Sequence, residues 1–351
     1  MKAENIVLDT IRQLWPVPTS GGMNSREVVR RSIEFANPPR MPYQFMYNPP
    51  ATDIIVIGPL EYAATSRKAA VGSTYVDQWG ITWEVSGRWW DHAIKHPLAD
   101  LKDVESYHMP DVITPVAKMK WATGLAWRAG KYVMGLDPVM MFETMRSLMG
   151  FENLMMAPYD QPDDLQSLLE RLTELTINCV KTYASMGTVN AFVHVEDWGL
   201  QASLQMKIDT FREHYKPFYK KIIDACHDNG MHFIWHNCGY IVDMFPDMIE
   251  LKVDVLQLDQ PRLMGHRNLI DLLGGKLCMW NPVDIQWSTM EGRTEDELRQ
   301  EVIDMTRIYD VRGHQGGFIA RHYPQPWDIN LSKARQKLIY DTYMQNGCRA
   351  L

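Results

Sequence analysis

The chain has 351 residues, of which 46% are hydrophobic and 23% charged, with a net charge of −7 and a pI of about 5.9. This composition is typical of a globular protein with a large core, and its acidic balance argues against a nucleic-acid or polybasic membrane-binding surface. Residues 1–15 mix charges with amphipathic spacing and lack the apolar core of a signal peptide or a membrane span, so we expect a soluble, cytoplasmic protein.

In chain order, the pattern predicts a helical extension over about residues 1–35 and a first strand over 41–46, but no clear second strand. Residues 72–96 alternate and hold several tryptophans, which predicts a hairpin or long insertion that covers a pocket. From residue 132 onward, short apolar runs alternate with longer amphipathic stretches. The predicted strands are 132–136, 191–196, 232–236, 254–258, 277–281 and 316–320, and the predicted helices include 162–185, 207–229, 241–251 and 294–309.

This alternation predicts an α/β fold made of parallel βαβ units. The simplest such fold is one (β/α)8 TIM barrel domain over residues 1–351, with the aromatic-rich insertion near its N-terminal half. The active site of such a barrel lies at the carboxyl ends of its strands. The most conspicuous polar residues fall at those ends, and they are Glu196, Asp197, His236, Cys238, Asp259, Asn281, Asp284, Arg321 and His322.

The strongest local pattern is His236-Asn237-Cys238-Gly239, which ends a buried strand. Side chains two apart in an extended chain point the same way, so the imidazole and the thiol can converge on one point. Both groups are zinc ligands. The alternative is a buried cysteine beside a hydrogen-bonded core histidine. The other cysteines are scattered without paired spacing, which argues against disulfides and for a reducing compartment, and they are Cys179, Cys226, Cys278 and Cys348.

The remaining candidates have less specific patterns. Asp259 is our first choice for an oxygen ligand, with a helix N-cap or a salt bridge as the alternative, and His322 competes for the same position, with a hydrogen-bonded loop histidine as the alternative. Glu196 and Asp197 form an acidic pair that either supplies a buried proton donor or is solvated. His194 points the same way as Glu196, so it either packs inside the barrel or supports these two candidate catalytic residues.

Several segments, taken together and in order, are similar to the uroporphyrinogen decarboxylase-like superfamily, and in particular to its corrinoid-dependent methyltransferase branch. The segments are 23–27, 37–42, 77–80, 96–100, 141–150, 196–199, 236–239, 281–284 and 316–319. The resemblance implies a barrel with a funnel-like site and, in the methyltransferase branch, a zinc ion bound through His-x-Cys. Two departures stand out. The arginine-rich segment with which the decarboxylases bind their substrate is replaced by residues 44–50, and the further zinc cysteine of thiol-methylating relatives is replaced by Arg321-His322-Tyr323.

Residues 224–230 resemble a cobalamin-binding signature with the wrong spacing, so we expect any corrinoid to be carried by a separate protein. The resemblance then implies a zinc-dependent methyltransferase that moves a methyl group between a small methylated substrate and the cobalt of that corrinoid (cobalamin). We favour O-demethylation of an aryl methyl ether, because zinc held by His236 and Cys238 would stabilise the leaving oxygen. The residues expected to bind the substrate are Trp79, Trp83, Tyr47, Met140 and Asn281, with Trp89 and Trp90 also in the insertion.

The sequence leaves other functions open. These are methyl transfer from the corrinoid to a thiol, decarboxylation of a small acid without a metal, and a non-catalytic module that binds zinc or a corrinoid protein. The missing cysteine after the last strand argues against the first of these. The exact substrate, the direction of transfer and the oligomeric state, a homodimer included, also stay open.

Overall fold

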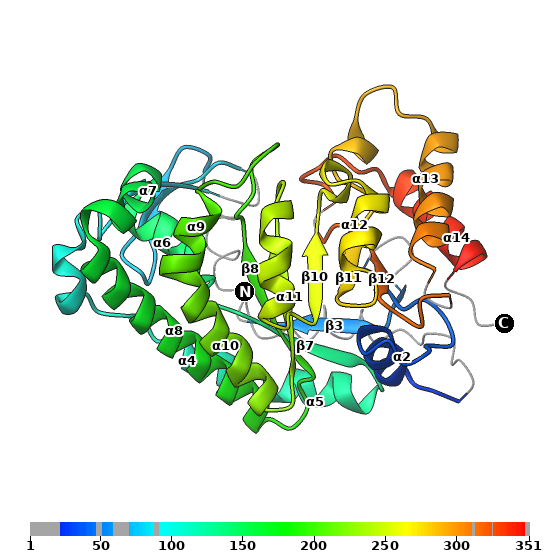
Figure 1. The fold of residues 1–351 in the computed structure, drawn as a ribbon, viewed down its shortest axis with the longest axis horizontal. Helices are drawn as coiled ribbons and strands as arrows, with labels where there is room; N and C mark the ends of the chain where they lie inside the picture. Colours follow the sequence, from blue (N-terminus) through cyan, green and yellow to red (C-terminus); the bar gives the residue numbers. More distant parts are fainter. Residues whose placement is uncertain are drawn as a thin grey trace.

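The computed structural model describes residues 22–46, 51–58, 70–87, 91–310, 313–324 and 326–347. Its centre is a nine-stranded sheet in the order β2-β1-β12-β11-β10-β9-β8-β7-β3, with helices packed outside it (Figure 1). Neighbouring strands are parallel except β1 and β2, as the predicted TIM barrel requires. The strands are β1 Tyr43–Phe45, β2 Ala51–Thr52, β3 Ile54–Ile57, β7 Tyr132–Leu136, β8 Ala191–Glu196, β9 His232–Asn237, β10 Val255–Leu258, β11 Cys278–Pro282 and β12 Phe318–Arg321.

Asp53 connects the two ends of this sheet. Its backbone N–H donates to the carbonyl of Tyr43 on β1 at 2.8 Å, and its own carbonyl accepts from the N–H of Tyr132 on β7 at 3.0 Å. Its carboxylate is fully buried and accepts two hydrogen bonds of 2.7 Å from the Arg40 guanidinium, a bidentate pair. One residue therefore joins β1, near one end of the sheet order, to β7, near the other end.

The second parallel strand, which the sequence pattern did not identify, is β3. It has four residues, all β-branched, and it pairs with β7. A run this short has no periodicity that separates a strand from a helix. Only the pairing with a neighbouring strand makes it recognisable.

The helices confirm most of the predicted boundaries. The helix α8 is Pro162–Ser185, as predicted. The stretch predicted as 207–229 is divided into α9 Ile208–Thr210, a π-helical segment Phe211–Tyr215 and α10 Lys216–Asp228. Thr294 and Glu297 form a reciprocal capping box at the start of α13. The other helices are α2 Ser25–Ile33, α4 Ile113–Ala117, α5 Lys120–Arg128, α6 Met141–Met149, α7 Phe151–Asp160, α9 Ile208–Thr210, α10 Lys216–Asp228, α11 Phe245–Glu250, α12 His266–Leu273, α13 Glu295–Ile308 and α14 Lys333–Asn346.

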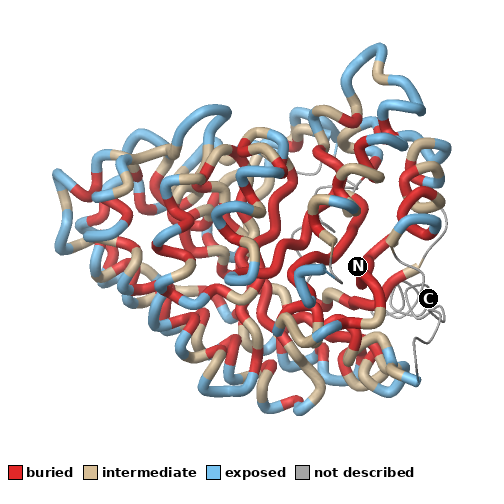
Figure 2. The backbone as a smooth tube through the Cα atoms, turned by 45° about the vertical axis from the view of Figure 1, so that its right-hand side comes forward, coloured by how far each residue is buried: buried red, intermediate tan, exposed pale blue. Residues whose placement is uncertain are grey.

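The inside of the barrel is packed with apolar side chains from every second strand position. Val193, Ile234 and Ile319 belong to this cluster, and α2 covers the amino end of the barrel by adding Val29 and Ile33 to it. Figure 2 shows that buried residues gather along the central strands and that exposed residues lie mostly in the peripheral turns. Because side chains alternate along a strand, cluster membership tells which later residues of each strand also face inward.

The predicted aromatic-rich insertion is a three-stranded antiparallel sheet of β4 Thr74–Val76, β5 Thr82–Glu84 and β6 His92–Lys95. A hydrogen bond of 2.9 Å from the Leu98 N–H to the Leu148 carbonyl ties the segment after β6 to α6. Across the described part of the chain, we find no helix with the length and apolar character needed to cross a membrane.

Candidate functional site

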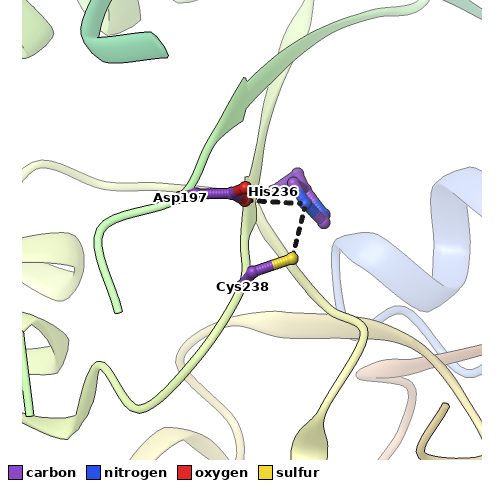
Figure 3. A group of neighbouring side chains, drawn as sticks. All are labelled: Asp197, His236 and Cys238. Atoms are coloured by element: carbon purple, nitrogen blue, oxygen red, sulfur yellow. Dashed lines mark hydrogen bonds and ion pairs between the residues drawn. The ribbon is translucent and has the colours of Figure 1, made fainter. Parts of the chain in front are cut away.

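Three ligand-type side chains converge where β8 and β9 end. They are Asp197, His236 and Cys238, and Figure 3 shows them pointing toward one another. The His236 Nε2 lies 3.6 Å from the Asp197 Oδ1 and 3.5 Å from the Cys238 Sγ, and all three ligand atoms lie within 4.8 Å of one another. We call this group the ligand cluster.

Strand alternation explains why these three side chains meet. On β8, Val193 packs in the barrel interior, so Asp197, four residues later, leaves the strand end on the same side. On β9, Ile234 packs in the interior, and His236 and Cys238 follow at two-residue intervals. The ligand cluster therefore lies inside the carboxyl-terminal mouth of the barrel.

Two glycines hold the loops that carry the ligand cluster. The Gly199 N–H donates to the Cys238 carbonyl at 3.1 Å, and the Tyr240 N–H donates to the Leu200 carbonyl at 2.7 Å. A Cβ atom on Gly239 would lie 2.3 Å from the Gly199 carbonyl carbon, and the φ of Gly239 is +78°. Only glycine permits both this approach and this backbone conformation. The glycines after Asp197 and Cys238 thus fix the spacing of their loops.

A glutamine orients the imidazole of His236. Its Nδ1 is hydrogen-bonded to the Gln257 Oε1, which can only accept, so Nδ1 carries a proton, and in the neutral ring Nε2 presents its lone pair to the ligand cluster. The Gln257 Nε2 in turn donates to the Asp259 Oδ1 at 2.8 Å. Asp259, our first choice for an oxygen ligand, therefore holds Gln257 in this structure, and the ligand cluster receives its oxygen from Asp197 instead.

The charges of the ligand cluster depend on one another. Burial disfavours the Asp197 carboxylate, but hydrogen bonding to His236 outweighs it and lowers the Asp197 pKa. Burial also disfavours the charged His236 ring, but Asp197 raises the His236 pKa above its usual value. Burial, followed by the charge of Asp197, raises the pKa of the Cys238 thiol well above its usual value. A cation in this position would favour the thiolate, because it would offset both effects.

Glu196 and His194 share one side of β8, as predicted, but that side faces the helices. The Glu196 carboxylate is buried and accepts from the N–H groups of Phe142 and Glu143 at 2.9 and 3.1 Å, and from the Tyr219 hydroxyl at 3.1 Å. The His194 Nε2 lies 2.7 Å from Glu196, and its Nδ1 lies 2.6 Å from Asp137. This buried chain of charges holds the start of α6 against β8.

We expect His194→Ala to lower the free energy of unfolding by about 3–5 kcal/mol at pH 6, because it leaves two buried carboxylates without their partner. Burial lowers the His194 pKa, but the two carboxylates outweigh it and raise the pKa to about 9. A raised histidine pKa stabilises the fold fully below the unfolded value of about 6.5, and this stabilisation is lost as the pH rises through about 9.

Denaturant unfolding at pH 6 and at pH 9.5 measures the free energy of unfolding of His194→Ala and of the wild type. The difference in this free energy between the two proteins should be smaller at pH 9.5. His227→Ala is the control, because His227 pairs with Asp254 at 2.8 Å but is partly exposed. We expect that variant to cost less than about 1 kcal/mol. An equally small, pH-independent loss in His194→Ala would contradict the stabilising role.

Glu143 is a candidate that sequence reasoning missed. It lies in the first turn of α6, with its Oε2 2.6 Å from Arg146 and with its Oε1 buried and without a hydrogen-bond partner among the described residues. Burial, followed by the charge of Asp197, raises the Glu143 pKa to about 8. Its signal was an acid in the first turn of the helix that follows β7, a common pattern that points to no single function.

The other predicted site residues are not members of the ligand cluster. His322 packs its ring 4.5 Å from that of Phe45, and the Asn281 Oδ1 accepts from the Leu258 N–H at 2.9 Å. Trp79 is buried in the main core, and the Trp83 Nε1 donates to Asp77 at 2.7 Å. Met140 caps the start of α6 in a left-handed conformation. Tyr47, Trp89 and Trp90 lie outside the described residues.

Comparison with protein families decides the relationship. Residues 93–321, well over half of the 351 residues, match the family model described as uroporphyrinogen decarboxylase (URO-D). The chain belongs to the uroporphyrinogen decarboxylase family. The part of this URO-D family member that matches includes the whole ligand cluster, Gln257 and Asp259, whereas β3 and most of the insertion precede it.

A solved structure resembles this URO-D family member in fold. A methyltransferase from Methanosarcina mazei is 13% identical, with 97% of each chain covered and a TM-score of 0.60. A chitinase from Chromobacterium violaceum is 8% identical, with 86% of this chain and 98% of the other covered and a TM-score of 0.39. No match was found among curated proteins. At these identities the first likeness shows a shared fold alone.

Proposed function

We propose that the protein is a zinc-dependent methyltransferase that transfers a methyl group from an aryl methyl ether to the cobalt of a separate corrinoid protein. One observation carries this proposal, namely the convergence of Asp197, His236 and Cys238 in the mouth of the barrel. The methyltransferase from Methanosarcina mazei, which has the same fold over 97% of its length, supports the reaction class. We place the activity in the cytoplasm, where Cys238 would stay reduced.

The ligand cluster fits zinc. Its donors are one oxygen, one nitrogen and one sulfur, all of which zinc accepts, and three protein ligands leave a fourth position for substrate. Tetrahedral coordination with bonds of about 2.0–2.3 Å places neighbouring ligand atoms about 3.3–3.8 Å apart. The separations of 3.6 Å between His236 and Asp197 and 3.5 Å between His236 and Cys238 fall within that range.

The protein's own residues prepare this chemistry. Gln257 fixes the His236 tautomer, the paired glycine loops hold Asp197 and Cys238, and Glu143 offers a proton for the leaving oxygen. When bound, zinc would supply Lewis acidity toward that oxygen. A donor set with one thiolate leaves the metal more electrophilic than a set with two, which favours ether cleavage over thiol methylation.

A separate corrinoid carrier is part of the proposal. His227 belongs to the segment that resembles a cobalamin-binding signature, in the last turn of α10. Its Nε2 lies 2.8 Å from the Asp254 Oδ2. That imidazole is therefore engaged within the fold, which supports a corrinoid brought by a partner protein.

The test combines the zinc-loaded full chain with a reduced corrinoid protein and a panel of methoxybenzenes. We expect the cobalt(I) spectrum to convert to methyl-cobalt(III) only when chain, zinc, corrinoid and ether are all present. Demethylation at full rate without corrinoid would contradict the proposal. Thiol methylation from methyl-corrinoid, with no ether demethylated, would instead support the reverse direction of transfer.

A further inference from the structure

A second group in the barrel mouth is not explained by the ligand cluster. Arg321 ends β12, and Ile319, two residues earlier, packs in the barrel interior, so the Arg321 side chain points inward as well. The residue is only 5% exposed. Its guanidinium lies 4.5 Å over the ring of Trp280 on β11, and its Nε donates to the His322 carbonyl at 3.3 Å.

The charge of Arg321 has no counter-ion among the described residues, where no carboxylate oxygen lies within 4.0 Å of its guanidinium. The other strongly buried arginine, Arg40, makes two 2.7 Å hydrogen bonds to Asp53. Buried charges in proteins are ordinarily paired, because taking an unpaired charge out of water is costly. The same fold thus satisfies one buried arginine and leaves the other to be satisfied by something else.

Trp280 adds a second donor at this position. Its ring is 3% exposed and belongs to the interior cluster, and its Nε1 is buried without a hydrogen-bond partner in the described chain. An anion seated between the guanidinium and the indole N–H would accept from both. The flat indole also offers an aromatic surface beside the charge.

The guanidinium faces the same space as the ligand cluster. Burial lowers the Arg321 pKa, and the charges of Asp259 and Cys238 act against that effect. The β-sheet register places Arg321 opposite Pro282 of β11 and Gln44 of β1, at the carboxyl end where the ligand cluster also lies. Arg321 and the ligand cluster therefore lie on the inner side of the barrel at the same end.

We propose that Arg321 and Trp280 bind a carboxylate of the substrate, so that the preferred substrate is a methoxylated aromatic acid. The inference rests on the proposed methyl transfer for its reaction and on the unpaired guanidinium for its substrate class. Carboxylate is favoured because the planar guanidinium matches it with two parallel hydrogen bonds, as Arg40 does with Asp53.

Binding of benzoate to the zinc-loaded full chain tests the site without any methyl transfer. Calorimetry should show binding to the wild type, about thirtyfold or more weaker binding to Arg321→Met, and an intermediate affinity for Arg321→Lys. Arg262→Met is the matched control, because Arg262 also lies over a tryptophan, at 4.6 Å from the Trp287 ring, but pairs with Glu301 at 2.6 Å. It should bind benzoate like the wild type.

Turnover provides the second measurement. With corrinoid present, 4-methoxybenzoate should be demethylated to 4-hydroxybenzoate with a kcat/KM about thirtyfold or more above that of methoxybenzene, and Arg321→Met should remove this preference. Absence of benzoate binding to the wild type, or tighter binding of inorganic phosphate, would overturn the carboxylate site. So would loss of the carboxyl group as carbon dioxide. If no ether is demethylated at all, the proposed function fails, and benzoate binding still decides the role of Arg321.

Discussion

Cys238→Ala is expected to strip the protein of zinc and to lower methyl transfer by more than about a hundredfold. Residues that only support a metal ligand already change metal affinity or activity by about 10–100-fold, so loss of a direct ligand should cost more. The Cys238 Sγ lies 3.5 Å from the His236 Nε2, a separation that suits two ligands of one metal ion. Metal content by mass spectrometry and the cobalt spectrum measure the two losses separately.

The matched control is Cys226→Ala, which removes a fully buried thiol on α10, away from the barrel mouth. It should keep about one zinc per chain. We expect His236→Ala and Asp197→Ala to behave like Cys238→Ala, and Asp259→Ala to weaken zinc binding about 10–100-fold through Gln257. His322→Ala should retain its metal. Full zinc content in both His236→Ala and Cys238→Ala would refute the ligand cluster.

The sequence predicted where the site lies better than it predicted which residues form it. Parallel strands bring their carboxyl ends together, so His236, Cys238 and the acidic pair at the end of β8 were expected in one region. The choice within that pair depends on which face of β8 packs inside the barrel, and Val193 decides it in favour of Asp197. A strand with apolar residues on both faces, such as 191–195, carries no such signal in its sequence.

The sequence also could not predict which residues surround the ligand cluster and orient it. Gln257 reaches His236 only because β9 and β10 pair with these two residues side by side. These two residues are 21 positions apart in the chain, and the register of their strands follows from the packing of the whole barrel. Glu143 belongs to α6, which approaches the site because Glu196 binds the first N–H groups of that helix.

Glu143→Gln is expected to slow demethylation of unactivated aryl ethers by about 10²–10⁴-fold, the usual contribution of a positioned general acid. The physical reason is the environment of its carboxyl group, where burial and the charge of Asp197 raise the pKa to about 8. At neutral pH this group carries a proton, and its Oε1 makes no hydrogen bond to any described residue. Glutamine keeps the shape of the side chain and removes that acidic proton.

Two further measurements, the pH profile and the effect of the leaving group, distinguish proton donation by Glu143 from a structural role. Activity that needs protonated Glu143 falls as the pH rises through the Glu143 pKa. In the zinc-loaded enzyme this pKa lies at or below about 8, because a cation on Asp197 cancels part of the negative charge that raised it. Glu143→Gln should lose this limb of the pH profile. A nitro-substituted phenoxide leaves without protonation, so the variant should demethylate 4-nitro-methoxybenzene at nearly the wild-type rate.

Glu152→Gln is the matched control, because Glu152 is exposed in the first turn of the next helix, α7, and should behave like the wild type. Zinc content should be unchanged in both variants, which separates proton donation from metal binding. An equal loss on nitro-substituted and unsubstituted ethers would show that Glu143 acts on the fold of the site. An unchanged pH profile would mean that the leaving oxygen takes its proton from solvent.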